Sequence, residues 1–173
     1  MLIIFFFDSQ GVVHKEFAPE GKTVNAEFYK GVMNRLLRRI QRVRPAAFCS
    51  GDFCLLHNNV PTHKAVSVCQ FSTQKSVKAL YQPSYPPDLS SPVYVLFPKL
   101  KMTLKGLHFA DVTEIQEAVT DELKKVQKED FSAAFQKLYD CAKDCIYANE
   151  AYFELKKKRC LRFLKKSVLK LVQ

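Results

Sequence analysis

The chain has 173 residues, 47% of them hydrophobic and 12% aromatic, so it is long enough to bury a core and too apolar to be disordered. Its longest apolar run, residues 2–7, is too short to cross a bilayer and lacks the flanks of a signal peptide, so no membrane partner is expected. The six cysteines form no paired framework, which favours a reducing, intracellular location.

The net charge of +10 is unevenly distributed. Residues 1–154 carry 19 basic and 17 acidic residues, whereas residues 155–173 carry eight basic residues and no acidic one. The high isoelectric point is therefore mostly a property of the C-terminal segment. We expect residues 1–154 to form one domain and residues 155–173 to form a basic amphipathic tail.

The first predicted element is a β-hairpin. Residues 2–7 read as a buried strand, residues 8–11 as a turn and residues 12–17 as the partner strand. Asp8 could be a catalytic acid, but Asp before Gly favours a turn for backbone reasons alone. We therefore interpret Asp8 as a turn residue.

Residues 25–44 are expected to form a helix that Asn25 caps and Pro45 ends. Apolar residues recur at helical spacing and draw one stripe: Phe28, Val32, Leu36, Ile40 and Val43. The other faces are basic, with Lys30, Arg35, Arg38, Arg39, Arg42 and Arg44. A basic face can neutralise phosphates, and it can equally be the solvated face of an amphipathic helix. Both readings stay open.

Strands and helices then alternate along the chain. We expect a strand at 53–57, a helix at 62–74, a strand at 77–82 and a helix from about residue 91. Asp111 with Glu114 resembles a capping box, and Asp130 is expected to open the next helix. The apolar residues of that helix should face inward: Phe131, Ala134, Phe135, Leu138, Ala142 and Cys145.

Two short motifs carry most of the functional information. Residues 55–63 read Leu-Leu-His-Asn-Asn-Val-Pro-Thr-His, and residues 85–97 read Tyr-Pro-Pro-Asp-Leu-Ser-Ser-Pro-Val-Tyr-Val-Leu-Phe. Together they resemble the downstream signatures of mariner-type transposases, Leu-His-Asp-Asn-Ala-Pro-x-His and Tyr-Ser-Pro-Asp-Leu-Ala-Pro-x-Asp-Tyr. In that family 34 residues separate the two catalytic aspartates, and 34 residues lie between the matching positions, Asn58 and Val93. The spacing is kept, but neither position has a carboxylate.

The resemblance implies a ribonuclease-H-like (DDE transposase) fold of the α/β class, with a mixed sheet flanked by helices. It also implies a reaction that uses Mg²⁺ held by carboxylates. Asn58 brings no charge and Val93 brings no ligand atom, so we expect no metal cofactor and no intact catalytic residue.

Two further parts of the family pattern are not found. The resemblance begins near residue 2, after the helix-turn-helix region and after the strand that carries the family's first aspartate. That strand is central in the fold, so we expect a truncated domain with exposed strand edges. Such edges would favour a homodimer or aggregation.

Two pairs of residues invite a metal or redox interpretation. His57 and His63 flank Asn58, yet both match residues of the family motif that are not its metal ligands. Cys141 and Cys145 lie four residues apart on one helix face, where small apolar side chains also fit a core. We interpret both pairs as structural and expect no metal site.

The basic tail has apolar residues at helical spacing, and it is compatible with a helix that binds anionic partners or with former non-coding sequence. The sequence indicates an inactive transposase remnant with weak, non-specific DNA binding in the nucleus. The candidate DNA-binding residues are Arg35, Arg38, Arg42, Lys156, Lys157, Lys158 and Arg159. The alternatives are a domesticated DNA-binding or protein-interaction module without activity, and a decaying copy without function.

Overall fold

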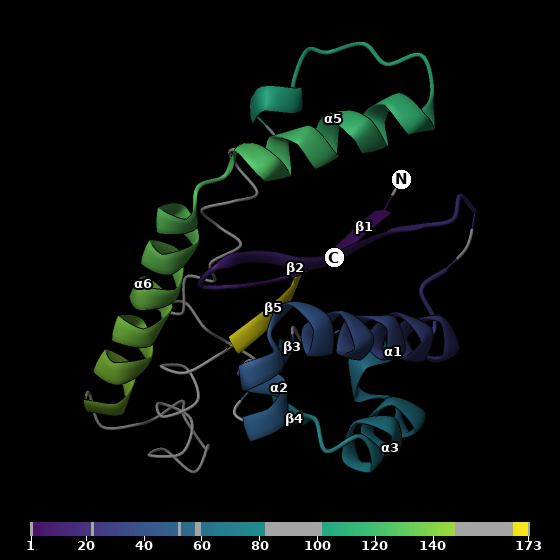
Figure 1. Cartoon of the computed structure of the whole chain (residues 1–173). Coiled ribbons are helices and arrows are strands. Elements are labelled where there is room, and N and C mark those ends of the chain that lie inside the picture. Colours follow the sequence, from purple (N-terminus) through teal and green to yellow (C-terminus); the bar gives the residue numbers. More distant parts are fainter. Residues whose placement is uncertain are drawn as a thin grey trace.

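The structure is a computed structural model, and it describes residues 2–21, 23–51, 53–57, 60–81, 102–147 and 168–172. A mixed sheet forms the middle of the molecule, with helices on both of its faces (Figure 1). The strands are β1 (Leu2–Asp8), β2 (Gly11–Ala18), β3 (Cys54–His57), β4 (Lys78–Tyr81) and β5 (Val168–Val172). Their order across the sheet is β2-β1-β5-β3-β4.

The predicted hairpin is confirmed. Strands β1 and β2 pair antiparallel, with an irregularity between Phe6 and Phe7. Asp8 is the last residue of β1 and the first position of the turn, where its Oδ1 accepts a hydrogen bond from the Gln10 amide at 2.8 Å. Its carboxylate is buried and also accepts from Arg44, with Nε to Oδ2 at 2.8 Å. The turn interpretation of Asp8 is therefore confirmed, and its charge is neutralised by Arg44.

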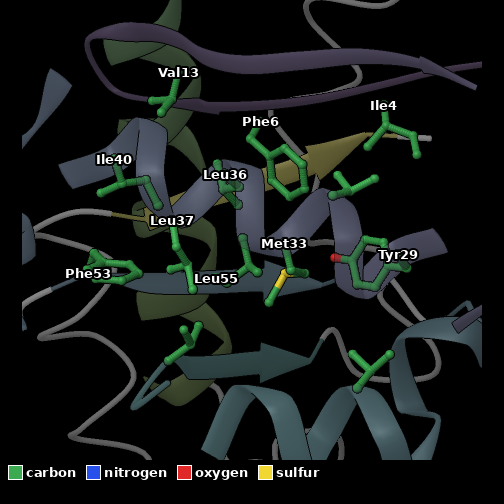
Figure 2. Close-up of a cluster of buried hydrophobic side chains, with 13 residues drawn as sticks. Ile4, Phe6, Val13, Tyr29, Met33, Leu36, Leu37, Ile40, Phe53 and Leu55 are labelled. Carbon is green, nitrogen blue, oxygen red and sulfur yellow. The ribbon is translucent and has the colours of Figure 1, made fainter. Parts of the chain in front are cut away.

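Helix α1 (Ala26–Val43) covers one face of the sheet. Asn25 caps it as expected, since its Oδ1 accepts from the Phe28 amide at 2.8 Å. Pro45 ends α1 and starts a short helix, α2 (Pro45–Ser50), because proline is favourable in a first helical turn. Figure 2 shows Leu36, Met33 and Phe6 in the layer beneath the hairpin, in the core that α1 shares with the sheet.

The helix expected at 62–74 is interrupted. A 3-10 turn, η1 (Pro61–Lys64), precedes helix α3 (Val66–Gln74), and Ala65 between them is extended with ψ of 138°. The break leaves His63 fully buried in η1. An extended residue cannot continue a helical hydrogen-bond ladder, so the two pieces remain separate.

Helices α5 (Val112–Lys125) and α6 (Lys128–Tyr147) cover the opposite face. Asp111 caps α5 through a 2.8 Å bond from the Glu114 amide, whereas α6 begins at Lys128, two residues before the expected Asp130. Alternate side chains of β1 pack in the cores on the two opposite faces of the sheet. Ile4 and Phe6 face α1, whereas Phe5 and Phe7 face α5 and α6.

The C-terminal segment differs most from the sequence-based expectation. Residues 168–172 form a strand, not part of an amphipathic helix, and this strand takes the central position that was expected to be empty. It pairs antiparallel with β1 and parallel with β3. The reason is physical: a short apolar Val- and Leu-containing run suits a strand as well as a helix, and neighbouring strands supply backbone partners. The predicted exposed edges on either side of the missing strand are therefore covered.

No helix in the described part of the chain is long and apolar enough to cross a membrane. The helix expected from about residue 91 lies outside the described residues, as do the side chains of Ala142 and Cys145.

Candidate nucleic-acid interface

A groove of about 780 Å³ follows the outer edge of the sheet, beside β2. Its floor comes from residues 10–15 of the hairpin, one wall from α1, and the other wall from the end of α5 and the start of α6. Seven basic residues line it and no acidic residue does, among those the structure describes: Lys15, Arg35, Arg38, Arg39, Arg42, Lys124 and Lys128. The groove is therefore a concentrated positive surface on a sheet edge.

Helical geometry explains the α1 wall. The apolar stripe of α1 is buried against the sheet, so residues on its flank project past the β2 edge. Arg35, Arg38 and Arg42 are spaced by three and four residues and lie on that flank, and all three are exposed. Arg39 lies beside them and donates from Nε to the Val13 carbonyl at 3.3 Å, which covers one backbone acceptor of the edge strand.

Arg35 differs from its neighbours because it forms a bidentate ion pair with Glu16. Its Nε lies 2.6 Å from Oε1 and its Nη2 lies 2.7 Å from Oε2 of the carboxylate. Burial raises the pKa of Glu16, but the hydrogen bonds from Arg35 and His14 outweigh it and hold that pKa below its usual value. Glu16 therefore stays ionised at neutral pH and partly neutralises Arg35.

The hairpin contributes a lysine that points across the groove floor. The Lys15 ammonium donates to the Thr120 hydroxyl on α5. Burial, and then repulsion from Lys124, lower the pKa of Lys15, while Asp121 opposes the shift. The repulsion shows that positive charges from β2 and α5 act on one another across the groove.

Arg38 and Arg42 are the basic residues most available to a ligand. Both are exposed, and neither has an acidic partner within the described ranges. Two nearby basic residues are engaged elsewhere. Arg44, which follows the end of α1, binds Asp8, and Lys30 of α1 lies 2.7 Å from Glu27. Sequence periodicity placed Arg35, Arg38 and Arg42 on one helix. Nothing in the sequence indicated that Lys15, Lys124 and Lys128 would join them, because that convergence is tertiary.

Six of the sequence-predicted site residues fall outside the described part of the chain. Asn58 and Val93 are outside the described residues, as are Lys156, Lys157, Lys158 and Arg159. Strand β3, which Asn58 follows, is separated from β2 by β5 and β1, about 14 Å across the sheet. The groove at the β2 edge is thus separated from strand β3 by two strands.

His57 and His63 pack in a buried aromatic cluster with Tyr29 of α1. The ring centroids of Tyr29 and His63 are 4.3 Å apart, and those of His57 and His63 are 5.2 Å apart. Burial, with a smaller contribution from His63, lowers the pKa of His57 to about 3, so this imidazole is neutral at physiological pH. Among described residues, no group of three or more His, Cys, Asp or Glu side chains could hold a metal ion.

Comparison with known proteins agrees with this architecture. A family model described as "Transposase (partial DDE domain)" matches residues 1–48. The chain is 25% identical over 154 residues to the Mariner Mos1 transposase of Drosophila mauritiana, covering 88% of this chain and 45% of that protein. It is 23% identical over 154 residues to human histone-lysine N-methyltransferase SETMAR, covering 89% of this chain and 22% of that protein. The chain therefore spans less than half of the length of these relatives.

Solved structures of Mos1 are similar over most of the chain. The crystal structure of the Mos1 catalytic domain matches with a TM-score of 0.76 and 27% identity, covering 88% of this chain and 75% of that chain. A pre-cleavage Mos1 transpososome matches with a TM-score of 0.76 and 26% identity, covering 88% of this chain and 45% of that chain. The fold is thus the ribonuclease-H-like fold of DDE enzymes. Within that class, the chain is similar to the catalytic domain of a mariner transposase.

Proposed function

We propose that this chain is a catalytically inactive, transposase-derived domain that binds the sugar–phosphate backbone of DNA through the β2-edge groove. The observation that carries the proposal is the groove lining, with seven basic residues from four elements and no acidic residue among those described. Phosphate contacts from Lys and Arg give affinity that is largely independent of sequence, so the binding is non-specific and weak at physiological salt.

The residues available do not fit a two-metal centre. Mg²⁺ in this fold needs carboxylates, and the positions matching two of the family's acids hold Asn58 and Val93. The central strand, which carries the first acid in the family, is here β5, with the sequence Val-Leu-Lys-Leu-Val. Its one charged residue is a lysine, so the strand offers no carboxylate. The Mos1 catalytic domain has been solved with Mg and with Mn, so the fold itself is compatible with a metal centre. The lack of fit in this chain therefore concerns its residues and not its fold.

The proposed location is the nucleus, where a basic domain of this kind would meet DNA. The bases Lys156, Lys157, Lys158 and Arg159 would add affinity from the tail. The alternative is a protein-interaction module, which would use the same positive surface for an acidic partner. DNA is favoured over an acidic protein because basic side chains line both walls and the floor of the groove. This arrangement suits an extended phosphate chain.

Fluorescence anisotropy with a labelled duplex of about 20 base pairs tests the proposal. The double variant Arg38→Gln/Arg42→Gln should bind at least about tenfold more weakly than the wild type at low salt. A matched control is Lys64→Gln/Lys75→Gln, which removes the same charge from exposed positions on η1 and at the end of α3. Equal losses in both double variants would mean that net charge, and not the groove, determines binding.

Inactivity is tested separately. Purified protein with Mg²⁺ or Mn²⁺ should neither nick nor join DNA that carries mariner ends. Metal-dependent cleavage that disappears in Asn58→Ala would contradict the argument from missing carboxylates.

A further inference from the structure

Strand β5 joins two halves of the sheet that are otherwise not paired with each other in the described structure. On one side Phe5, Phe6 and Phe7 of β1 face Val172, Leu171 and Lys170. On the other side the partners of Val168, Leu169 and Lys170 are Cys54, Leu55 and Leu56 of β3. The pairing is antiparallel with β1 and parallel with β3, so β5 fills one defined slot in one direction.

An empty slot between β1 and β3 would be energetically unfavourable. Residues 4–7 of β1 and 54–56 of β3 are buried, with alternate side chains in the cores on the two faces of the sheet. Without a strand between them, the N–H and C=O groups of β1 and β3 that face each other would be buried without partners, which is unfavourable. An extended segment satisfies both rows at once.

The sequence of β5 matches this slot. Four of its five residues are Val or Leu, as expected for a strand whose neighbours are buried on both faces. In sequence, however, β5 is remote from the rest, with 20 residues, 148–167, between it and the end of α6. A segment attached in this way acts as a tethered ligand, present at a millimolar effective concentration.

We propose that the gap between β1 and β3 is a peptide-binding site for an extended apolar segment. Val168–Val172 is its resident occupant, and a second copy of that segment supplied in trans can take its place. The site works by strand addition, in which backbone hydrogen bonds give affinity and alternate side chains give selectivity. This inference concerns the sheet interior and is independent of DNA binding at the β2 edge.

The register provides a direct test in the full chain. Cys54 and Val168 are register partners on adjacent strands, about 4.8 Å apart, within the range that a disulfide can bridge. Oxidised Val168→Cys should therefore form a disulfide with native Cys54, located by peptide mapping. Leu169→Cys is the matched control, because successive strand residues point to opposite faces and its register partner is Leu55. Linkage in the control at the same yield, or none in Val168→Cys, would overturn the assigned occupant.

Occupancy in trans is tested with the variant Lys170→Pro and a fluorescent peptide of residues 165–173. Proline at a central strand position removes a ladder hydrogen bond, and Lys170 is paired with both Phe7 and Leu56. The peptide should bind this variant and raise its Tm, whereas it should bind the wild type weakly because the slot is filled. A peptide carrying the same proline should bind more than about tenfold less tightly.

If Lys170→Pro is unfolded, recovery of cooperative unfolding on adding the wild-type peptide at millimolar concentration supports the proposal. Failure to recover at that concentration contradicts occupancy in trans. Equal binding of both peptides, or a variant as stable as the wild type that binds neither, shows that the slot is not a strand-acceptor site.

Discussion

Acidification should destabilise this protein through the buried imidazole of His57. The folded pKa is about 3 and the ordinary value is 6.5. Between these values the unfolded chain binds a proton that the folded protein does not, so the free energy of unfolding falls as the pH falls. The contribution of neutral His57 is fully present above about pH 6.5 and is lost progressively as the pH approaches 3.

The expected size follows from the two pKa values. Moving from about pH 7.5 to about pH 5 should remove about 2 kcal/mol of stability through this one group, and the complete loss at lower pH is about 5 kcal/mol. Urea unfolding at the two pH values measures the first quantity. His57→Gln is the comparison, because it keeps a polar side chain but does not titrate.

The readout is the difference in pH dependence between the two proteins, and not their absolute stability. His14, His63 and His108 remain in both proteins, so the two differ in this respect only at position 57. His63 is the nearest of them and lies against His57 in the cluster with Tyr29. Parallel losses of stability in wild type and variant between the two pH values would refute the assignment of the effect to His57.

Two further stability predictions follow from the α1 side of the molecule. Leu36→Ala, at a position 1% exposed in the core beneath α1 (Figure 2), should lower the free energy of unfolding by about 2–5 kcal/mol, seen as a lower urea midpoint with an unchanged m-value. Asn25→Ala should cost about 1 kcal/mol, because it removes the acceptor for the Phe28 amide, whereas Asn25→Gly should cost a few tenths. Equal losses for Ala and Gly would argue that the cap bond contributes little.

Local patterns predicted much of the fold. The hairpin was readable because an apolar run, an Asp-to-Gly turn and a second run follow one another in residues 2–17. Helix α1 was readable from its cap and its stripe, since both depend only on neighbouring residues. The motif around Asn58 indicated the resemblance to mariner-type transposases, because spaced residues are more specific than composition.

Long-range pairing was not predictable in the same way. The run Val-Leu-Lys-Leu-Val fits a short strand and also one turn and a half of an amphipathic helix, and the slot between β1 and β3 decides between them. The groove likewise depends on tertiary convergence, because Lys15 lies on strand β2 and Lys124 and Lys128 belong to helices much later in the sequence than α1. The finding on β5 also changes how the tail can be tested. Deleting residues 155–173 would remove a central strand, so tail charges are better removed by substitution.

The measurement that tests the central claim most directly is the salt dependence of duplex binding in three proteins. These are the wild type, Arg38→Gln/Arg42→Gln, and a tail variant with Lys156, Lys157, Lys158 and Arg159 changed to Gln. Each phosphate contact contributes about 0.9 to the slope of log affinity against log salt, so loss of both groove arginines should flatten the slope by about 1.8. The account predicts a larger loss per charge removed in the groove variant than in the tail variant. An unchanged slope in the groove variant, with the tail variant losing most of its slope, would contradict it.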